Sequence, residues 1–265
     1  MFTDTHCHIH EDDYPLDPEA AYTRAMADGV DRLLCVGTSA DSSARAMSFA
    51  AAHAGVWAVI GIHPHEAAKF GAALGVFGGS NGGWAAIQEL ALTNPAKLVG
   101  IGECGLDYYY HDDEDDRQLQ RDLLRQHLEL ASALQLPVSF HVRDAFDDFW
   151  PIFDEFKGIR GVLHSFTDSS DNLAKALERG LYIGVNGIST FTKIPEQITM
   201  FSSIPLEKLL LETDAPYLTP KPLRGSINEP AFITHVARSH AALRGIPVEA
   251  VATATDRNAT SLFSI

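Results

Sequence analysis

The first ten residues hold an unusual concentration of side chains that can bind metal ions. Residues 3–10 read TDTHCHIH, an aspartate followed by histidines at three alternate positions. Because successive side chains of a β-strand point to opposite faces, His6 and His8 would face one way and Cys7 the other. Both imidazoles could then bind one ion, although a lone histidine is more often an ordinary core or surface residue. The spacing therefore predicts a candidate metal site whose other ligands come from elsewhere in the chain.

Further residues of ligand type follow short apolar runs later in the chain. Glu103 follows LVGIG, His141 follows LPVSF, His164 follows GVL and Asp214 follows LLLET. If these runs are strands of one parallel barrel, their carboxyl ends meet on the face where such barrels carry active sites. The alternative is chance clustering, since loops at strand ends are solvated and polar. With His6 and His8 there are six ligands, more than a closed zinc site needs, so we expect two ions that share a bridging carboxylate.

Short apolar, β-branched runs alternate with amphipathic ones along the chain. This alternation is typical of βα units around a parallel sheet. Strands are expected at residues 2–6, 31–36, 56–61, 98–102, 138–141, 161–164, 181–185 and 208–212. Helices are expected near 18–28, 41–53, 84–94, 114–135, 144–156, 170–179, 195–202 and 229–243, with a last helix near 247–262 packed on the outside. The pattern predicts an α/β fold, a (β/α)8 TIM barrel, as a single domain over residues 1–265.

The chain is acidic, with 35 Asp and Glu against 20 Lys and Arg and a formal net charge of -15. Such a field repels nucleic acid and anionic membranes at long range, so a phosphate-bearing substrate needs a local positive source. Two divalent ions would supply it, because Glu103 and Asp214 cancel only two of their four positive charges. Three cysteines without a disulfide spacing, and no stretch typical of a signal peptide or a membrane span, favour a cytoplasmic protein.

Seven motifs, in order along nearly the whole chain, resemble those of the TatD family of metal-dependent deoxyribonucleases. They are TDTHCHIH, GIHPHEA (61–67), GECGLDYYY (102–110), LPVSFHVRDA (136–145), LHSFT (163–167), LLLETDAPYLTP (209–220) and RGSINEP (224–230). The resemblance implies an amidohydrolase-like TIM barrel that holds two divalent metal ions and hydrolyses phosphodiester bonds, typically from a DNA end. It assigns His6, His8, Glu103 and Asp214 to one ion, and Glu103, His141 and His164 to the other.

The same resemblance implies residues that act on the phosphate. His63 would contact the scissile phosphate, and its alternative role is to cap the loop after the third strand. Arg143 suits a phosphate because a guanidinium can pair with two oxygens, and its alternative is a salt bridge with Asp144 or Asp147. Asp214 would take a proton from the attacking water.

Residues around these have more ordinary interpretations. Asp107 is expected to order its loop or orient a ligand histidine, and Glu212 either orients a histidine or is satisfied by backbone donors. Asn228 is expected to cap the last barrel helix, with Pro230 in its first turn. The acidic run at 111–116 is interpreted mainly as a solvated helix start, and the glycine-rich stretch at 78–83 as a mobile loop.

Three functions stay open from the sequence. The first is a deoxyribonuclease, an exonuclease that uses metal-activated water on DNA ends or on a small phosphate ester. The second is a related esterase or amidase such as a D-aminoacyl-tRNA deacylase. The third is a non-catalytic metal-bound barrel, against which the complete ligand set argues. Mixed imidazole and carboxylate ligands leave Mg²⁺, Mn²⁺ and Zn²⁺ open, and no obligate protein partner is evident.

Overall fold

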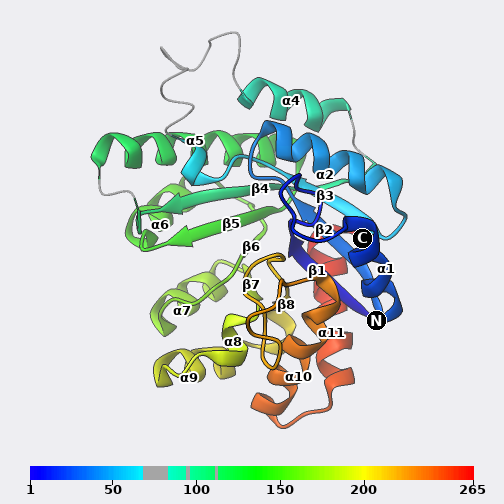
Figure 1. The fold of residues 1–265 in the computed structure, drawn as a ribbon. Helices are drawn as coiled ribbons and strands as arrows, with labels where there is room; N and C mark the ends of the chain where they lie inside the picture. Colours follow the sequence, from blue (N-terminus) through cyan, green and yellow to red (C-terminus); the bar gives the residue numbers. More distant parts are fainter. Residues whose placement is uncertain (68–82, 94–95, 111–112) are drawn as a thin grey trace.

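The computed structural model describes residues 1–67, 83–93, 96–110 and 113–265, and its centre is a parallel barrel (Figure 1). Eight strands form one parallel sheet in chain order, which confirms the predicted (β/α)8 TIM barrel. The strands are β1 (Phe2–Cys7), β2 (Val30–Val36), β3 (Val56–Ile60), β4 (Leu98–Asp107), β5 (Val138–Arg143), β6 (Gly161–Leu163), β7 (Tyr182–Val185) and β8 (Leu209–Leu211).

Helices surround the strands on all sides visible in Figure 1. They are α1 (Pro18–Ala27), α2 (Ala40–Ala52), α4 (Gly83–Thr93), α5 (Glu114–Leu134), α6 (Phe146–Glu155), α7 (Ser170–Glu178), α8 (Ile188–Phe191), α9 (Pro195–Ser203), α10 (Ile233–Arg244) and α11 (Val248–Phe263), with short 3₁₀ turns η1 (Pro64–Glu66), η2 (Leu206–Lys208) and η3 (Pro230–Phe232). The short helix α8 was not predicted. Residues 78–82 of the glycine-rich stretch lie outside the described residues, as do 94, 111 and 112. Among the helices described, none is both long and apolar enough to cross a membrane.

The barrel closes between its first and last strands through bonds beyond β8. The backbone N–H of Asp214 donates to the carbonyl of His6, and the N–H of His8 donates to the carbonyl of Ala215. Below them, the buried carboxylate of Asp4 accepts from the backbone N–H and the hydroxyl of Thr213. The segment after β8 is thus fixed against the carboxyl end of β1.

Alternation along the strands separates the barrel interior from the layer beneath the helices. Leu34, Val36, Val59, Val162 and Leu210 form one buried cluster, whereas their strand neighbours pack in the larger cluster with the helices. Residues of α11, among them Leu262 and Phe263, belong to the interior cluster. The expectation that this helix packs on the outside is therefore wrong. It lies across the amino end of the barrel, where residues far apart in the chain contact it.

Two predicted boundaries also change for identifiable reasons. β4 continues through Glu103 to Asp107 instead of ending at Gly102, because its second half pairs with β5 after a register shift. The helix expected from residue 229 begins as the 3₁₀ turn η3, and α10 starts only at Ile233. Asn228 does not cap it, because its side-chain amide donates to the carbonyls of Thr213 and Tyr217. At α5 the acidic start is confirmed for the described residues, with Asp113 as N-cap.

Candidate metal centre

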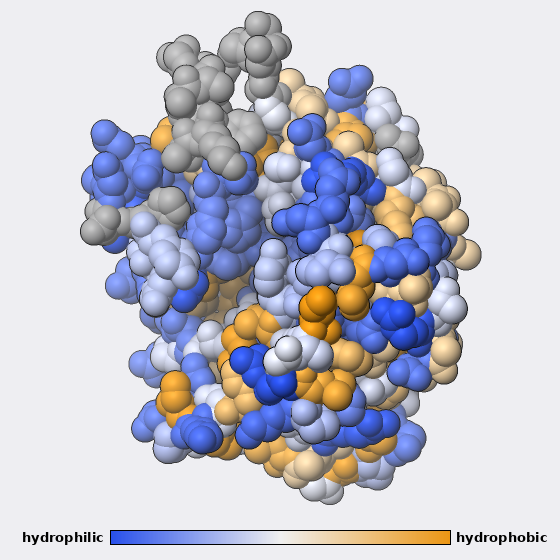
Figure 2. All heavy atoms as spheres, viewed as in Figure 1, coloured by the Kyte–Doolittle hydropathy of each residue, from blue (hydrophilic) through white to orange (hydrophobic). Residues whose placement is uncertain are grey.

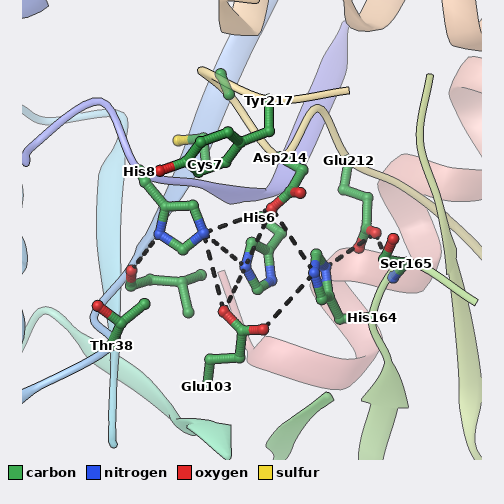
Figure 3. Close-up of polar contacts among 12 residues, drawn as sticks. His6, Cys7, His8, Thr38, Glu103, His164, Ser165, Glu212, Asp214 and Tyr217 are labelled. Atoms are coloured by element: carbon green, nitrogen blue, oxygen red, sulfur yellow. Dashed lines mark hydrogen bonds and ion pairs between the residues drawn. The ribbon is translucent and has the colours of Figure 1, made fainter. Parts of the chain in front are cut away.

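The histidines of β1 reach one point inside the barrel. His6 and His8 face the interior, whereas Cys7 between them packs with the outer cluster. The Nε2 atoms of the two imidazoles lie 3.2 Å apart, and Glu103 Oε2 lies 3.3 Å from the first and 3.8 Å from the second (Figure 3). Two ring nitrogens and a carboxylate oxygen that converge on one buried point form a donor set typical of a divalent ion site.

Asp214 and His164 complete this side of the centre. Asp214 Oδ1 lies 3.4 Å from His8 Nε2 and 3.7 Å from His164 Nε2. Asp214 adopts a left-handed backbone with φ 59°, and its N–H is bonded to β1. The rings of His6 and His164 stack with their centroids 3.5 Å apart. The structure therefore brings residues from β1, β4 and the ends of β6 and β8 to one place.

Glu103 stands between two groups of histidines. Its Oε2 faces the pair from β1, while its Oε1 lies 2.8 Å from His141 Nδ1, 3.4 Å from His63 Nε2 and 3.8 Å from His164 Nε2. All six residues predicted as ligands are thus linked through contacts of 3.8 Å or less. A carboxylate with one oxygen toward each group is the arrangement expected of a bridging ligand.

Three histidines are oriented by acceptors that lie on the other side of their rings. His8 Nδ1 lies 2.8 Å from the carbonyl of Val36, and His164 Nδ1 lies 3.0 Å from Glu212 Oε1. His141 Nε2 lies 2.9 Å from Asp107 Oδ2. These contacts fix which ring nitrogen points at the centre.

Glu212 and Asp107 each make both kinds of contact considered from the sequence, one with a histidine and one with a backbone N–H. Glu212 also accepts from the backbone N–H of Ser165 at 2.6 Å. Asp107 also accepts from the backbone N–H of Tyr109 at 3.0 Å, so it orders its loop as well. The third histidine of the opening motif, His10, does not join the site. Its ring centroid lies 6.3 Å from that of His8, and its Nε2 lies 3.4 Å from the hydroxyl of Ser42.

The two residues predicted to contact a phosphate, His63 and Arg143, both line the cavity above the centre. His63 Nδ1 accepts from the backbone N–H of His65 and so caps the turn η1, while its Nε2 faces Glu103. Both roles considered for this residue are therefore compatible. Arg143 is exposed at the mouth, and its guanidinium lies 3.7 Å from the ring centre of Tyr109. Within the described residues it forms no ion pair with Asp144 or Asp147, which removes the alternative role.

Burial and mutual charge shift the pKa values of the side chains at the centre. Burial, with the neighbouring imidazole of His164, lowers the pKa of His6 to about 4. His8 and His164 are buried and His141 is half-buried, but adjacent carboxylates outweigh the loss of solvent and raise their pKa values to about 9, 10 and 8, respectively. The surrounding histidines hold the pKa of Glu103 well below its usual range. Without an ion, protons on three histidines therefore balance the carboxylates.

A cavity of about 800 Å³ opens above these residues. Several of its lining residues were not singled out as site residues from the sequence, among them Thr38, His65, Tyr110, Ser165 and Tyr217. His65 lies in the same G-I-H-P-H motif as His63, and its Nε2 lies 2.9 Å from Asp107 Oδ2. The signal in the sequence that could have identified His65 is its position two residues after His63 in this motif. Figure 2 shows mainly hydrophilic side chains over α5 and the nearby ends of β4 and β5.

Comparisons with known proteins show which family the chain belongs to. A family model described as TatD related DNase matches residues 3–264. The chain is 33% identical to an uncharacterized metal-dependent hydrolase, YabD, of Bacillus subtilis, with 100% of both proteins covered. It is 34% identical to the 3'-5' ssDNA/RNA exonuclease TatD of Salmonella typhimurium, with 94% of each covered.

A solved structure gives the same result at the level of the fold. The crystal structure of YjjV, a TatD homolog from Escherichia coli, superimposes with a TM-score of 0.88 at 30% identity and covers 100% of this chain and 98% of that one. The match runs through the strands that carry the histidines and carboxylates described above. This chain is a metal-dependent hydrolase that belongs to the TatD related DNase family.

Proposed function

We propose that the protein is a phosphodiesterase that removes nucleotides from the end of a single-stranded nucleic acid. The observation that carries the proposal is Glu103, which presents one oxygen to each of two groups of histidines beneath an open cavity. That arrangement would suit two divalent ions that act together on a phosphate. The name of the Salmonella relative, an exonuclease of single-stranded DNA and RNA, supports the substrate class.

The residues present would suit two divalent ions. His6, His8, Glu103 and Asp214 would hold one, and Glu103, His141 and His164 the other. Donor atoms of His6, His8 and Glu103 lie within 4.8 Å of one another, and those of Glu103 and His141 converge in the same way with His63. When bound, such ions neutralise charge on phosphate oxygens and lower the pKa of a water molecule. Imidazole with carboxylate ligands suits Zn²⁺ and Mn²⁺, and carboxylate with water suits Mg²⁺.

The protein's own groups then have distinct tasks. Asp214, whose pKa is lowered by the histidines around it despite burial, is ionised at neutral pH and can accept a proton. His63 donates from Nε2, because its Nδ1 is occupied as an acceptor, and it can therefore bind a phosphate oxygen. Arg143 supplies a positive charge at the mouth, where an anionic strand enters.

The surroundings of the centre support action at a strand end. A second cavity of about 310 Å³ shares His8, Thr38 and Tyr217 with the first. It is lined by three acids, Glu11, Asp12 and Asp13, and by Arg45, which is paired with Glu11 at 2.5 Å. These charges oppose a phosphate backbone that continues past the centre.

The test is a cleavage assay with metal-depleted protein to which Mg²⁺, Mn²⁺ or Zn²⁺ is returned. Substrates are a single-stranded oligonucleotide labelled at either end, a small phosphodiester and an aminoacylated tRNA. We expect stepwise release of mononucleotides from one labelled end. Asp214→Asn should lower the rate at least about 100-fold, while Asp171→Asn, at an exposed site in the first turn of α7, should not. Cleavage of the tRNA ester alone would instead favour the deacylase alternative, and equal rates in Asp214→Asn would contradict its role.

A further inference from the structure

Three tyrosines expose most of their surface beside the metal centre. Tyr109, Tyr110 and Tyr217 are 54%, 66% and 58% exposed, which is high for aromatic side chains. Tyr110 and Tyr217 line the main cavity, and Tyr217 also lines the second one. Exposed aromatic rings around a polar cavity are typical of sites that bind flat, partly apolar groups.

These rings lie on opposite sides of the centre. Tyr217 follows β8, and its ring centroid lies 6.4 Å from that of His8. Tyr110 follows β4, and its ring centroid lies 5.8 Å from that of His65. Because β4 and β8 are four strands apart in an eight-stranded barrel, a strand that crosses the centre would meet one ring before it and one ring after it.

Both aromatic positions are held by contacts with the centre itself. The backbone N–H of Tyr217 donates to the carbonyl of Asp214 at 2.8 Å, and its carbonyl accepts from the side chain of Asn228 at 2.5 Å. This is the contact that replaces the expected helix cap. On the other side, Arg143 lies over the ring of Tyr109, which meets Tyr110 edge to face with centroids 4.5 Å apart. The backbone of Tyr217 and the ring of Tyr110 are therefore positioned by neighbouring groups before any ligand binds.

We propose that Tyr217 and Tyr110 stack on unpaired bases on either side of the scissile phosphate, so that they select single strands over duplexes. This inference rests on the proposed function and names the residues that recognise the bases of the substrate. Stacking on an aromatic side chain accepts any base and is closed to a base that is already paired and stacked in a duplex. The inference also explains how an acidic protein holds nucleic acid, because stacking needs no net positive charge.

The experiment compares oligonucleotides that differ only in the bases next to the cleaved bond. One has normal bases throughout, and the other has abasic sites at its last two positions. Tyr217→Ala and Tyr110→Ala are measured against Tyr217→Phe and Tyr110→Phe, which keep the ring and lose only the hydroxyl. For each alanine variant we expect KM for the normal strand to rise about 5- to 150-fold. The phenylalanine variants should behave as wild type, and a small base-free phosphodiester should be cleaved at an unchanged rate.

A binding measurement tests this inference independently of whether the protein cleaves phosphodiesters. Metal-loaded wild type is titrated with the same two strands carrying phosphorothioates at the last linkages, with fluorescence anisotropy as the readout. If wild type cleaves no phosphodiester, the proposed function fails, yet weaker binding of the abasic strand would still support stacking. Equal binding of both strands, or alanine variants with an unchanged KM, would overturn the inference. So would equal cleavage of a single-stranded and a blunt duplex end.

Discussion

Three histidines of the candidate centre make a contact at each ring nitrogen. On one side they face the centre, and on the other they meet a carbonyl or a carboxylate, as His141 meets Asp107 and His164 meets Glu212. Such contacts fix the tautomer and the ring orientation, and they make the ring a better ligand. At the residue scale, if these histidines are ligands, metal affinity depends on groups that never touch the ion.

Asp107 offers the cleanest test of this dependence. Asp107→Asn keeps the size of the side chain but removes the charge that contributes to the raised pKa of His141. We expect metal affinity at pH 8 to fall about 10- to 100-fold, measured by competition with a chelator. Because the pKa of His141 would also fall, protons should compete less, and metal binding should change less between pH 6 and pH 8 than in wild type.

The matched control is Asp115→Asn, which makes the same change at an exposed position in the first turn of α5. It should bind metal as wild type does. An unchanged metal Kd and pH profile in Asp107→Asn would show that this carboxylate only orders the loop through Tyr109.

At the element scale, the strands explain how much of the site the sequence could predict. The two-residue period of β1 puts His6 and His8 on one face whatever the rest of the fold does, and closure of the barrel makes that face the interior one. Likewise Glu103, His141, His164 and Asp214 follow apolar runs, so their shared end of the barrel follows from parallel topology alone. Their roles as ligands stay a prediction, as does the single domain over residues 1–265.

What could not be predicted depends on contacts between distant segments. The length of β4 is set by its pairing with β5. Asn228 resembles a helix cap in the sequence, yet the carbonyls of Thr213 and Tyr217 take its side chain because the loop after β8 folds back onto it. Local patterns carry no information on such contacts, and the same holds for the position of α11 at the amino end of the barrel.

Gly184 of β7 leaves the space that the Glu212 carboxylate occupies beside the site. A Cβ at this position would lie 2.3 Å from Glu212 Oε2, and this buried carboxylate is held by His164 and Ser165. Gly184→Ala should therefore displace Glu212 and weaken metal binding about 10-fold or more, with a loss of stability of about 1–3 kcal/mol from overpacking.

Metal affinity by chelator competition and thermal unfolding would measure both effects. Gly225→Ala is the control, because a Cβ there meets nothing within 4 Å and only the backbone at φ 95° is strained. It should lose stability through that strain and bind metal normally. If both variants bound metal equally well, the packing of β7 would not position Glu212.

At the scale of the whole molecule, the metal-free protein balances its charges with protons. The net charge of -15 is spread over the chain, but the barrel interior concentrates carboxylates among histidines. The pKa of His164 is raised from 6.5 to about 10, chiefly by Glu212 and Glu103 acting against burial. Burial raises the pKa of Asp4 from 3.8 to about 8. Both groups hold a proton in the folded chain that they would lose in the unfolded chain at neutral pH.

These shifts fix how the stability of the metal-free protein depends on pH. A raised pKa stabilises the fold fully below the unfolded pKa, and the contribution disappears as pH rises through the folded value. For His164 the loss runs from about pH 6.5 to about 10, and for Asp4 it is complete above about pH 8. Glu103 and Asp214, whose pKa values are lowered, act in the opposite sense and lose their contribution below about pH 4.

Chelated protein should therefore be most stable near pH 5–6 and become less stable toward pH 9. Even one unit of net shift is worth about 1.4 kcal/mol, which for a chain of this size is a few degrees in Tm. If these histidines hold a divalent ion, the ion takes the place of their protons, and metal-loaded protein should keep its Tm, or gain, over the same range. Calorimetric scans of both forms between pH 5 and 9 would measure the difference. Parallel curves for the two forms would mean that protons and metal ions do not compete for the same histidines, and the candidate centre would have to lie elsewhere.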